Sequence, residues 1–247
     1  SLDPQDEYLC LEGTSFFSPG HPDGNNVTRL TWKDRRWLFD LHYINFTPRY
    51  HSGVTVSFEG RQDEPPLLTS LDLEADLPST GLLQSTACDF NRADWTRRIV
   101  WRKGRYFLFI DTVKALETGD YRIDGRWRTR GDISLAGNVL KVLQGDKAFF
   151  IKSADQTPRT VVDEPDGYSS TWNYPYGNGK CSVLLARERL ALGRGSVRTL
   201  ASLMYAAEAA EKDAIDIVRI GDGLYGITDA GRRQVAGLQQ QIEAREH

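Results

Sequence analysis

The segment of residues 18–60 begins with Ser18-Pro-Gly-His21-Pro-Asp23-Gly-Asn25-Asn26 and continues, after a short strand-like stretch, with Leu38-Phe-Asp40-Leu-His42-Tyr43, Arg49-Tyr50-His51 and Val54-Thr-Val56-Ser-Phe58. Three of the four histidines of the chain lie in it. Histidine, aspartate and tyrosine side chains bind metals and transfer protons, so this segment is a candidate functional site. Pro-Gly, Pro-Asp-Gly and Asn-Asn are also turn signals, and spacing alone favours ordinary turns and strand ends here.

Alternation of apolar and polar residues indicates a fold built mainly from strands. Val54, Val56 and Phe58 alternate with Thr55 and Ser57, as in a strand that buries one face. Similar signals recur at residues 27–32, 36–40, 82–87, 95–101, 106–113, 134–142 and 197–205. The sequence therefore predicts an all-β domain over residues 1–228.

The C-terminal residues 229–247 have a helical pattern instead. Asp229 can cap a helix, and Val235, Leu238 and Ile242 recur at helical spacing with polar residues between them. We therefore expect the β domain to be followed by a C-terminal α-helix or tail.

Composition argues against several classes of function. The chain has 247 residues and a net charge of −3, whereas a nucleic-acid-binding protein needs a basic face. The sequence contains no apolar run long enough to cross a membrane and no signal peptide. Its three cysteines form no Cys-x-x-Cys motif, which leaves one disulfide or only free thiols open. We therefore expect neither a nucleic-acid partner nor a membrane partner.

A long loop with room for one short strand is predicted over residues 157–180, where proline, glycine, asparagine and aspartate accumulate. It contains the aromatic residues Tyr168, Trp172, Tyr174 and Tyr176. Long loops in compact domains are often functional, and aromatic side chains beside asparagine and glycine can stack on sugar rings. The alternative is that these aromatics cap the end of a β-sandwich.

The order of several motifs resembles one known family. The motif His-x-Asp-Gly-Asn starts at His21, apolar-apolar-Asp-x-x-Tyr ends at Tyr43, and His51 opens an alternating strand. These motifs resemble the start of the C-terminal β-sandwich of heparinase II/III-like polysaccharide lyases, and residues 94–101, 106–111 and 200–206 resemble later strands of that domain. The resemblance spans residues 7–228 and implies an antiparallel stacked-sheet β-sandwich.

The resemblance also implies a chemistry, the β-elimination of uronic-acid-containing acidic polysaccharides. Such an enzyme neutralises the carboxylate next to C5, removes the C5 proton and protonates the departing glycosidic oxygen. In the family the β domain supplies the histidine of His-x-Asp, which matches His21, and Tyr43 is a second candidate catalytic residue. Candidate substrate-binding residues are Asn25, His42, Trp172 and Tyr174.

A zinc ion is a further implication of the resemblance. Its ligands would be Asp23, Asp40 and His51, two carboxylates and an imidazole that leave a fourth position for water. This sequence has Asp23 where the clearest zinc-binding members have histidine. The alternative is that Asp40 bonds backbone amides at a strand end and that His51 is a hydrogen-bonded, half-buried imidazole.

The lyases that this chain resembles place their active site between the β domain and an N-terminal helical toroid, which usually supplies a tyrosine and a histidine or asparagine. No region of this sequence reads as a toroid, so we expect a helical toroid domain or subunit to complete the site. A periplasmic or secreted location is expected. The alternative function is a non-catalytic carbohydrate-binding or structural β-sandwich module of a larger secreted protein.

Overall fold

The protein is a stack of antiparallel β-sheets, seen in a computed structural model that describes residues 3–13, 15–16, 24–40, 48–61, 66, 68–165 and 180–237. The central layer is a nine-stranded sheet. In spatial order its strands are β11 (Asp132–Ala136), β12 (Val139–Gln144), β13 (Lys147–Ser153), β16 (Val197–Glu208), β9 (Tyr106–Ala115), β8 (Ala93–Arg102), β7 (Thr80–Cys88), β6 (Leu68–Leu77) and β2 (Ser15–Phe16). The predicted all-β, antiparallel stacked-sheet fold is thereby confirmed.

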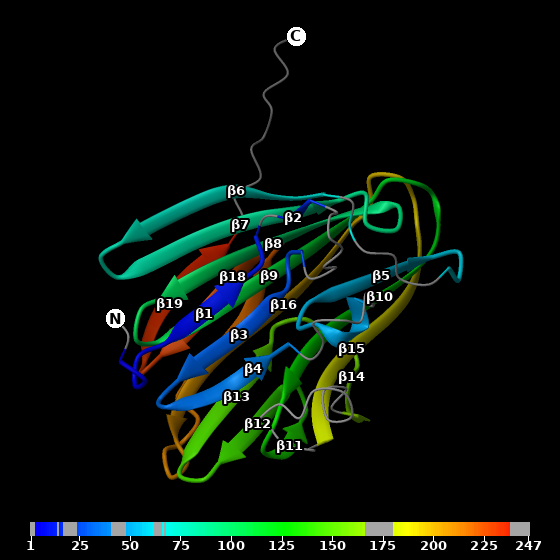
Figure 1. Cartoon of the computed structure of the whole chain (residues 1–247). Helices are drawn as coiled ribbons and strands as arrows, with labels where there is room; N and C mark the ends of the chain where they lie inside the picture. The colour runs from blue at the N-terminus through cyan, green and yellow to red at the C-terminus, as the bar shows by residue number, and fades with distance from the viewer. Residues whose placement is uncertain are drawn as a thin grey trace.

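Two smaller sheets cover one face of the central layer (Figure 1). Their strands are β1 (Tyr8–Leu11), β3 (Val27–Trp32) and β4 (Arg35–Phe39), and β14 (Arg159–Pro165), β15 (Lys180–Leu192), β10 (Gly119–Thr129) and β5 (Val54–Phe58). Large aromatic side chains fill the space between the layers. Trp37 stacks on Phe149 with 5.2 Å between ring centroids, and Trp127 meets Phe109 at 5.0 Å. Aromatic burial of this kind dominates the energetics of a core, so these contacts fix the stacking of the sheets.

The third layer covers the opposite face of the central sheet. It consists of β17 (Ile215–Gly221), β18 (Leu224–Asp229) and β19 (Arg232–Gly237), which lie behind the central sheet in Figure 1. Side chains of β16 alternate between the two faces: Ser202 accepts a hydrogen bond from Trp127, whereas Tyr205 donates one to Asp213 beside β17. Between them, the layers on both sides bury the middle strands β13, β16 and β9, whereas β11 and β6 toward the two edges keep exposed side chains.

The predicted helix at the C-terminus is wrong for residues 229–237, which continue as strand. Strands β18 and β19 pair in a hairpin whose turn residues, Ala230 and Gly231, have φ angles of 47° and 79°. Two successive positive φ angles match the twist of a two-residue hairpin. Asp229 does not cap a helix but accepts two hydrogen bonds from Arg105, and Val235 is 67% exposed. Residues 238–247, where the rest of this helix was predicted, lie outside the described residues.

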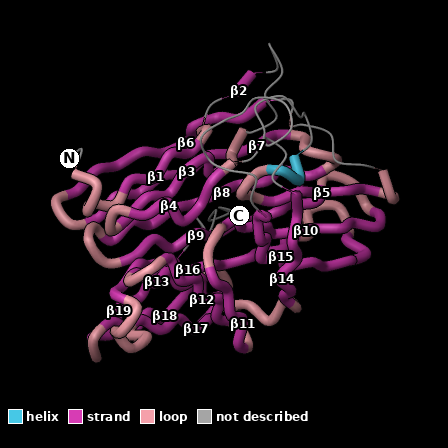
Figure 2. The backbone as a smooth tube through the Cα atoms, turned by 60° about the horizontal axis from the view of Figure 1, so that its bottom comes forward, coloured by secondary structure: helices cyan, strands magenta, loops and turns pink. Residues whose placement is uncertain are grey.

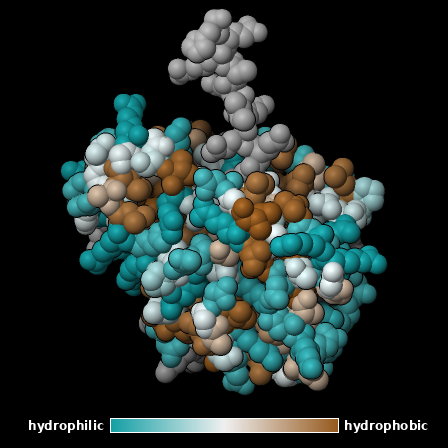
Figure 3. All heavy atoms as spheres, turned by 180° about the vertical axis from the view of Figure 1, so that it is seen from behind, coloured by the Kyte–Doolittle hydropathy of each residue, from teal (hydrophilic) through white to brown (hydrophobic). Residues whose placement is uncertain are grey.

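On the face turned away from the viewer of Figure 1, hydrophobic side chains form small groups surrounded by hydrophilic ones (Figure 3). Helical structure in the described ranges is limited to η1 (Pro48–Tyr50), which lies beside β5 (Figure 2), and these ranges hold no helix suited to crossing a bilayer.

Candidate functional site

The structure brings Asp40 and His51 together where two strands end. Asp40 follows β4, and its backbone N–H donates to the carbonyl of Thr28 on β3 at 3.1 Å. His51 follows η1, and its N–H donates to the carbonyl of Pro48 at 3.1 Å. The two side chains meet with 2.6 Å between Nδ1 of His51 and Oδ1 of Asp40. Backbone hydrogen bonds therefore hold both members of the pair in place.

The environment of His51 fixes the orientation of its ring. The side chain is 2% exposed, and that of Asp40 is 18% exposed. In a neutral imidazole, the contact with Asp40 places the proton on Nδ1 and leaves a lone pair on Nε2. Nε2 is buried and has no hydrogen-bond partner within the part of the chain that the structure describes. A buried nitrogen without a partner is unfavourable, so Nε2 is suited to a metal ion or a ligand.

Among the described residues, the pair offers a metal ion one ligand atom, which differs from the predicted set of three ligands. Nδ1 and Oδ1 already bond each other, so the position left for an ion is at Nε2. A carboxylate that accepts a hydrogen bond from the other ring nitrogen is the usual support of a metal-bound histidine. Within the described ranges no three His, Cys, Asp or Glu side chains cluster closely enough to bind a metal. Asp23, the third predicted ligand, lies outside those ranges.

Asn25 is part of the same end of the sandwich but is completely buried. Its side-chain amide donates to the carbonyl of Trp95 at 2.9 Å, and its side-chain oxygen accepts from the hydroxyl of Ser85. Its φ angle of 66° lies in the left-handed region that asparagine tolerates. In this arrangement the side chain of Asn25 holds the turn before β3 against β8 and β7. The other predicted site residues, His21, His42, Tyr43, Trp172 and Tyr174, lie outside the described residues.

Arg97 organises the two loops that carry the site, and sequence reasoning missed it. Its guanidinium is fully buried and makes two hydrogen bonds to Asp111, at 2.7 and 2.9 Å. It also donates to the carbonyls of Asn25 at 3.1 Å and Ser52 at 3.2 Å. One signal was available, because strand alternation puts Arg97 on the same face as the core residue Trp95.

Gly53 shows how closely the site loop approaches the central sheet. A Cβ atom there would lie 2.7 Å from the ring of Trp95 and 1.7 Å from the side-chain oxygen of Asn26. Neither contact is sterically possible. Only glycine therefore allows the chain to pass between these side chains on its way from His51 into β5.

A buried ionic group lies next to the pair of Asp40 and His51. Glu164 accepts hydrogen bonds from Arg126 and from Arg128, the latter at 2.6 Å. Both arginines also donate to the carbonyl of Arg49, at 2.9 and 3.4 Å. Burial alone would raise the pKa of Glu164, but the two guanidinium groups outweigh it and hold the pKa below its ordinary value. The carboxylate therefore stays ionised and fixes the backbone two residues before His51.

Glu164→Gln tests this arrangement through the pH dependence of stability. A carboxyl with a lowered pKa in the folded state contributes stability above its unfolded pKa of about 4.3, and that stability is lost as the pH falls through the folded value. We expect Glu164→Gln to be less stable than wild type at pH 7 and to differ less from it at pH 3. Urea unfolding at both pH values measures this, with the exposed Glu74→Gln as control. An equal deficit at both pH values would contradict the assignment.

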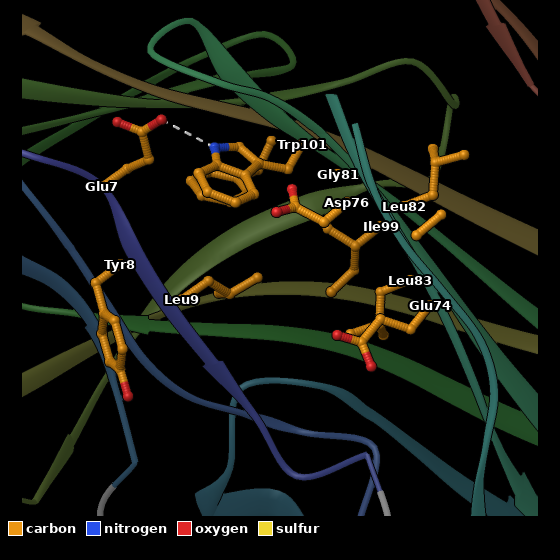
Figure 4. Close-up of a pocket in the computed structure, with 12 residues that line it drawn as sticks. Glu7, Tyr8, Leu9, Glu74, Asp76, Gly81, Leu82, Leu83, Ile99 and Trp101 are labelled. Carbon is orange, nitrogen blue, oxygen red and sulfur yellow. Dashed lines mark hydrogen bonds between the residues drawn. The ribbon is translucent and has the colours of Figure 1, made fainter. Parts of the chain in front are cut away.

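A hollow of about 400 Å³ lies away from this pair, between β1 and strands β6 to β9 (Figure 4). Its lining includes the apolar side chains of Leu9 and Trp101, and the indole N–H of Trp101 donates to Glu7 at 2.9 Å. Glu7, Glu74 and Asp76 place three carboxylates around it. This charge disfavours an anionic ligand, which distinguishes the hollow from the end of the sandwich that holds His51.

Three antiparallel layers of this kind define the protein as a β-sandwich of the type found in heparinase III lyases. The heparan sulfate lyase HepC from Pedobacter heparinus superposes with a TM-score of 0.72 and 15% identity, covering 98% of this chain and 40% of that one. A crystal structure of heparinase III gives a TM-score of 0.72 and 10% identity, covering 96% of this chain and 40% of that one. The predicted resemblance is thus confirmed at the level of the fold, and the chain spans about 40% of these lyases. No family model and no curated protein matches the sequence.

Proposed function

We propose that this chain is the β-sandwich part of a heparinase II/III-like polysaccharide lyase that cleaves uronic-acid-containing acidic polysaccharide by β-elimination. The observation that supports this most directly is the pair of Asp40 and His51, with the second ring nitrogen of His51 buried and without a partner in the described residues. The shared fold with heparan sulfate lyases supports it independently.

The proposed reaction assigns separate tasks to the residues of this end. His21 and Tyr43 transfer protons, and Asn25 positions the turn that follows His21. Asp40 holds the ring of His51 so that Nε2 faces the ligand. A zinc ion held by His51 Nε2 and Asp23 would supply positive charge for the substrate carboxylate. His42, Trp172 and Tyr174 remain proposed sugar contacts.

A helical toroid domain or subunit completes the site in this proposal, because the chain spans about 40% of the lyases whose fold it shares. A substrate of this kind, an extracellular polysaccharide, fits a periplasmic or secreted protein.

Product formation tests the proposed function. We expect the complete protein to release unsaturated uronate products, read as new ultraviolet absorbance, from at least one acidic polysaccharide. The isolated chain should bind the same polymer and release little or no product, because one positioned acid–base group is worth only about 10²–10⁴-fold in rate. A complete protein that binds polysaccharide without cleaving any of a panel of uronic-acid polymers would support the alternative, a non-catalytic carbohydrate-binding module.

A further inference from the structure

One face of the four-stranded sheet is rich in arginine. In β10, Ile123 and Trp127 point into the core, so the even-numbered residues between and beside them point away from the central sheet. Residues that pair directly across strands share a face, and Arg122 pairs with Arg189 of β15. This arginine face consists of Arg122, Arg126, Arg128, Arg187 and Arg189, with the three carboxylates Asp120, Asp124 and Glu164.

The charges of this face are neutralised unevenly. Arg187 makes two hydrogen bonds to the buried Asp124, at 2.8 and 2.6 Å, and Arg122 lies 3.6 Å from the same carboxylate, so one negative charge faces two guanidinium groups. Glu164 likewise accepts hydrogen bonds from both Arg126 and Arg128, so its charge is shared between them. Arg189 is exposed and makes no ion pair with any residue that the structure describes. In a chain with a net charge of −3, the face therefore retains an excess of positive charge.

Arg122 and Arg189 line a hollow of about 440 Å³ at the far end of this face. Ser57 and Gly60 also border it, and Asp120 is the one carboxylate among its lining residues. The hollow therefore combines two guanidinium groups, one hydroxyl and one carboxylate. Guanidinium groups bind carboxylate and sulfate oxygens through paired hydrogen bonds, which makes the hollow suitable for an anionic group of a ligand.

The hollow is connected to the candidate site along a single strand. Arg126 and Arg128 bond the carbonyl of Arg49, two residues before His51, and Arg122 lies six residues before Arg128 on β10. Six residues of strand span about 20 Å, a length that several sugar units of an extended polymer can bridge. Figure 2 shows η1, which contains Arg49, beside β5 and close to β10.

We infer that the arginine face is a distal subsite for the acidic polysaccharide, in which Arg122 and Arg189 hold a sulfate or carboxylate group about 20 Å from His51. This inference rests on the proposed function, since it extends the substrate of the same site. The subsite contributes binding of long polymers and not the elimination step itself.

The first test measures binding of the isolated chain to heparin, a sulfated uronic-acid polymer, and to its desulfated form. Arg189→Gln is expected to weaken binding about tenfold, the effect of losing one charge-assisted contact. Arg232→Gln, an exposed change on β19 in the opposite layer, is the matched control and should bind as wild type. A loss confined to heparin assigns the group to sulfate, and a loss on both polymers assigns it to carboxylate. Equal binding by the two variants, or an equal loss on polyphosphate, would overturn the inference.

The second test separates this inference from the proposed function. In the complete protein, Arg189→Gln should raise KM for a long polymer and leave kcat, and cleavage of a tetrasaccharide, unchanged. If the complete protein releases no unsaturated product but Arg189→Gln still weakens heparin binding, the function is wrong and the subsite stands. If cleavage occurs and KM for long polymers does not change, the subsite is wrong and the function stands.

Discussion

Replacing Arg97 by methionine is expected to lower the free energy of unfolding by about 3–5 kcal/mol, the usual effect of removing one partner of a buried ion pair. The side chain of Arg97 is fully buried, and the change leaves the carboxylate of Asp111 without its two charged donors. The carbonyls of Asn25 and Ser52 lose their donor as well. The change also removes the contacts of the guanidinium carbon with three aromatic rings. Their centroids lie 5.0 Å away for Trp95, 5.5 Å for Phe109 and 4.9 Å for Trp127.

Urea unfolding at pH 7 measures this loss. Arg102→Met, on the same strand but partly exposed, is the matched control and should change stability by about 0.5 kcal/mol or less. The double change Arg97→Met with Asp111→Asn should recover part of the deficit, because it also removes the unpaired charge. A loss below about 1 kcal/mol for Arg97→Met alone would mean that the pair does not hold the two loops in place.

The second large effect concerns activity. His21→Ala in the complete protein is expected to lower kcat by about 10²–10⁴-fold, because it removes a proposed proton-transfer group. His51→Ala is expected to lower kcat by about 10²–10³-fold, because it removes the proposed holder of positive charge at the substrate carboxylate. Asp40→Asn should lower it by about 10–100-fold, because the ring of His51 stays in place but loses the carboxylate that orients it. Asp76→Asn, in the acid-lined hollow beside β1, is the control and should leave the rate unchanged.

Zinc binding gives a readout that does not depend on turnover. Zinc should raise the midpoint of thermal unfolding of the wild-type chain, because an ion that binds only the folded state stabilises it. The midpoint of His51→Ala should not respond. An unchanged rate in His51→Ala would exclude this histidine from the reaction, and an equal response to zinc in both proteins would exclude Nε2 as a ligand.

The sequence predicted the strands well where alternation is strict and failed where two periodicities overlap. Along β8, residues of alternating burial form the repeat of a strand with one face in the core, and this repeat is local to the chain. In residues 229–237, a capping aspartate and spaced apolar residues were compatible with a helix. These residues form a strand instead, because the chain turns at Ala230 and Gly231 and the following residues pair with β18. Local pattern alone does not contain the partner strand that supplies those hydrogen bonds.

The sequence determined the residue types of the candidate site, but not which of their atoms contact one another. The segment of residues 18–60 identified Asp40 and His51 as a possible pair through chemistry and motif order. Only the tertiary structure decided that Nδ1 meets Oδ1 and that Nε2 is left buried, because β3, β4 and η1 fix the two backbones independently. Arg97 meets Asp111 across the hairpin of β8 and β9, whereas Arg122 and Arg189 are brought together by the register of strands distant along the chain. Register is set by the packing of whole sheets, and so it brings together charges whose relation cannot be read from the sequence.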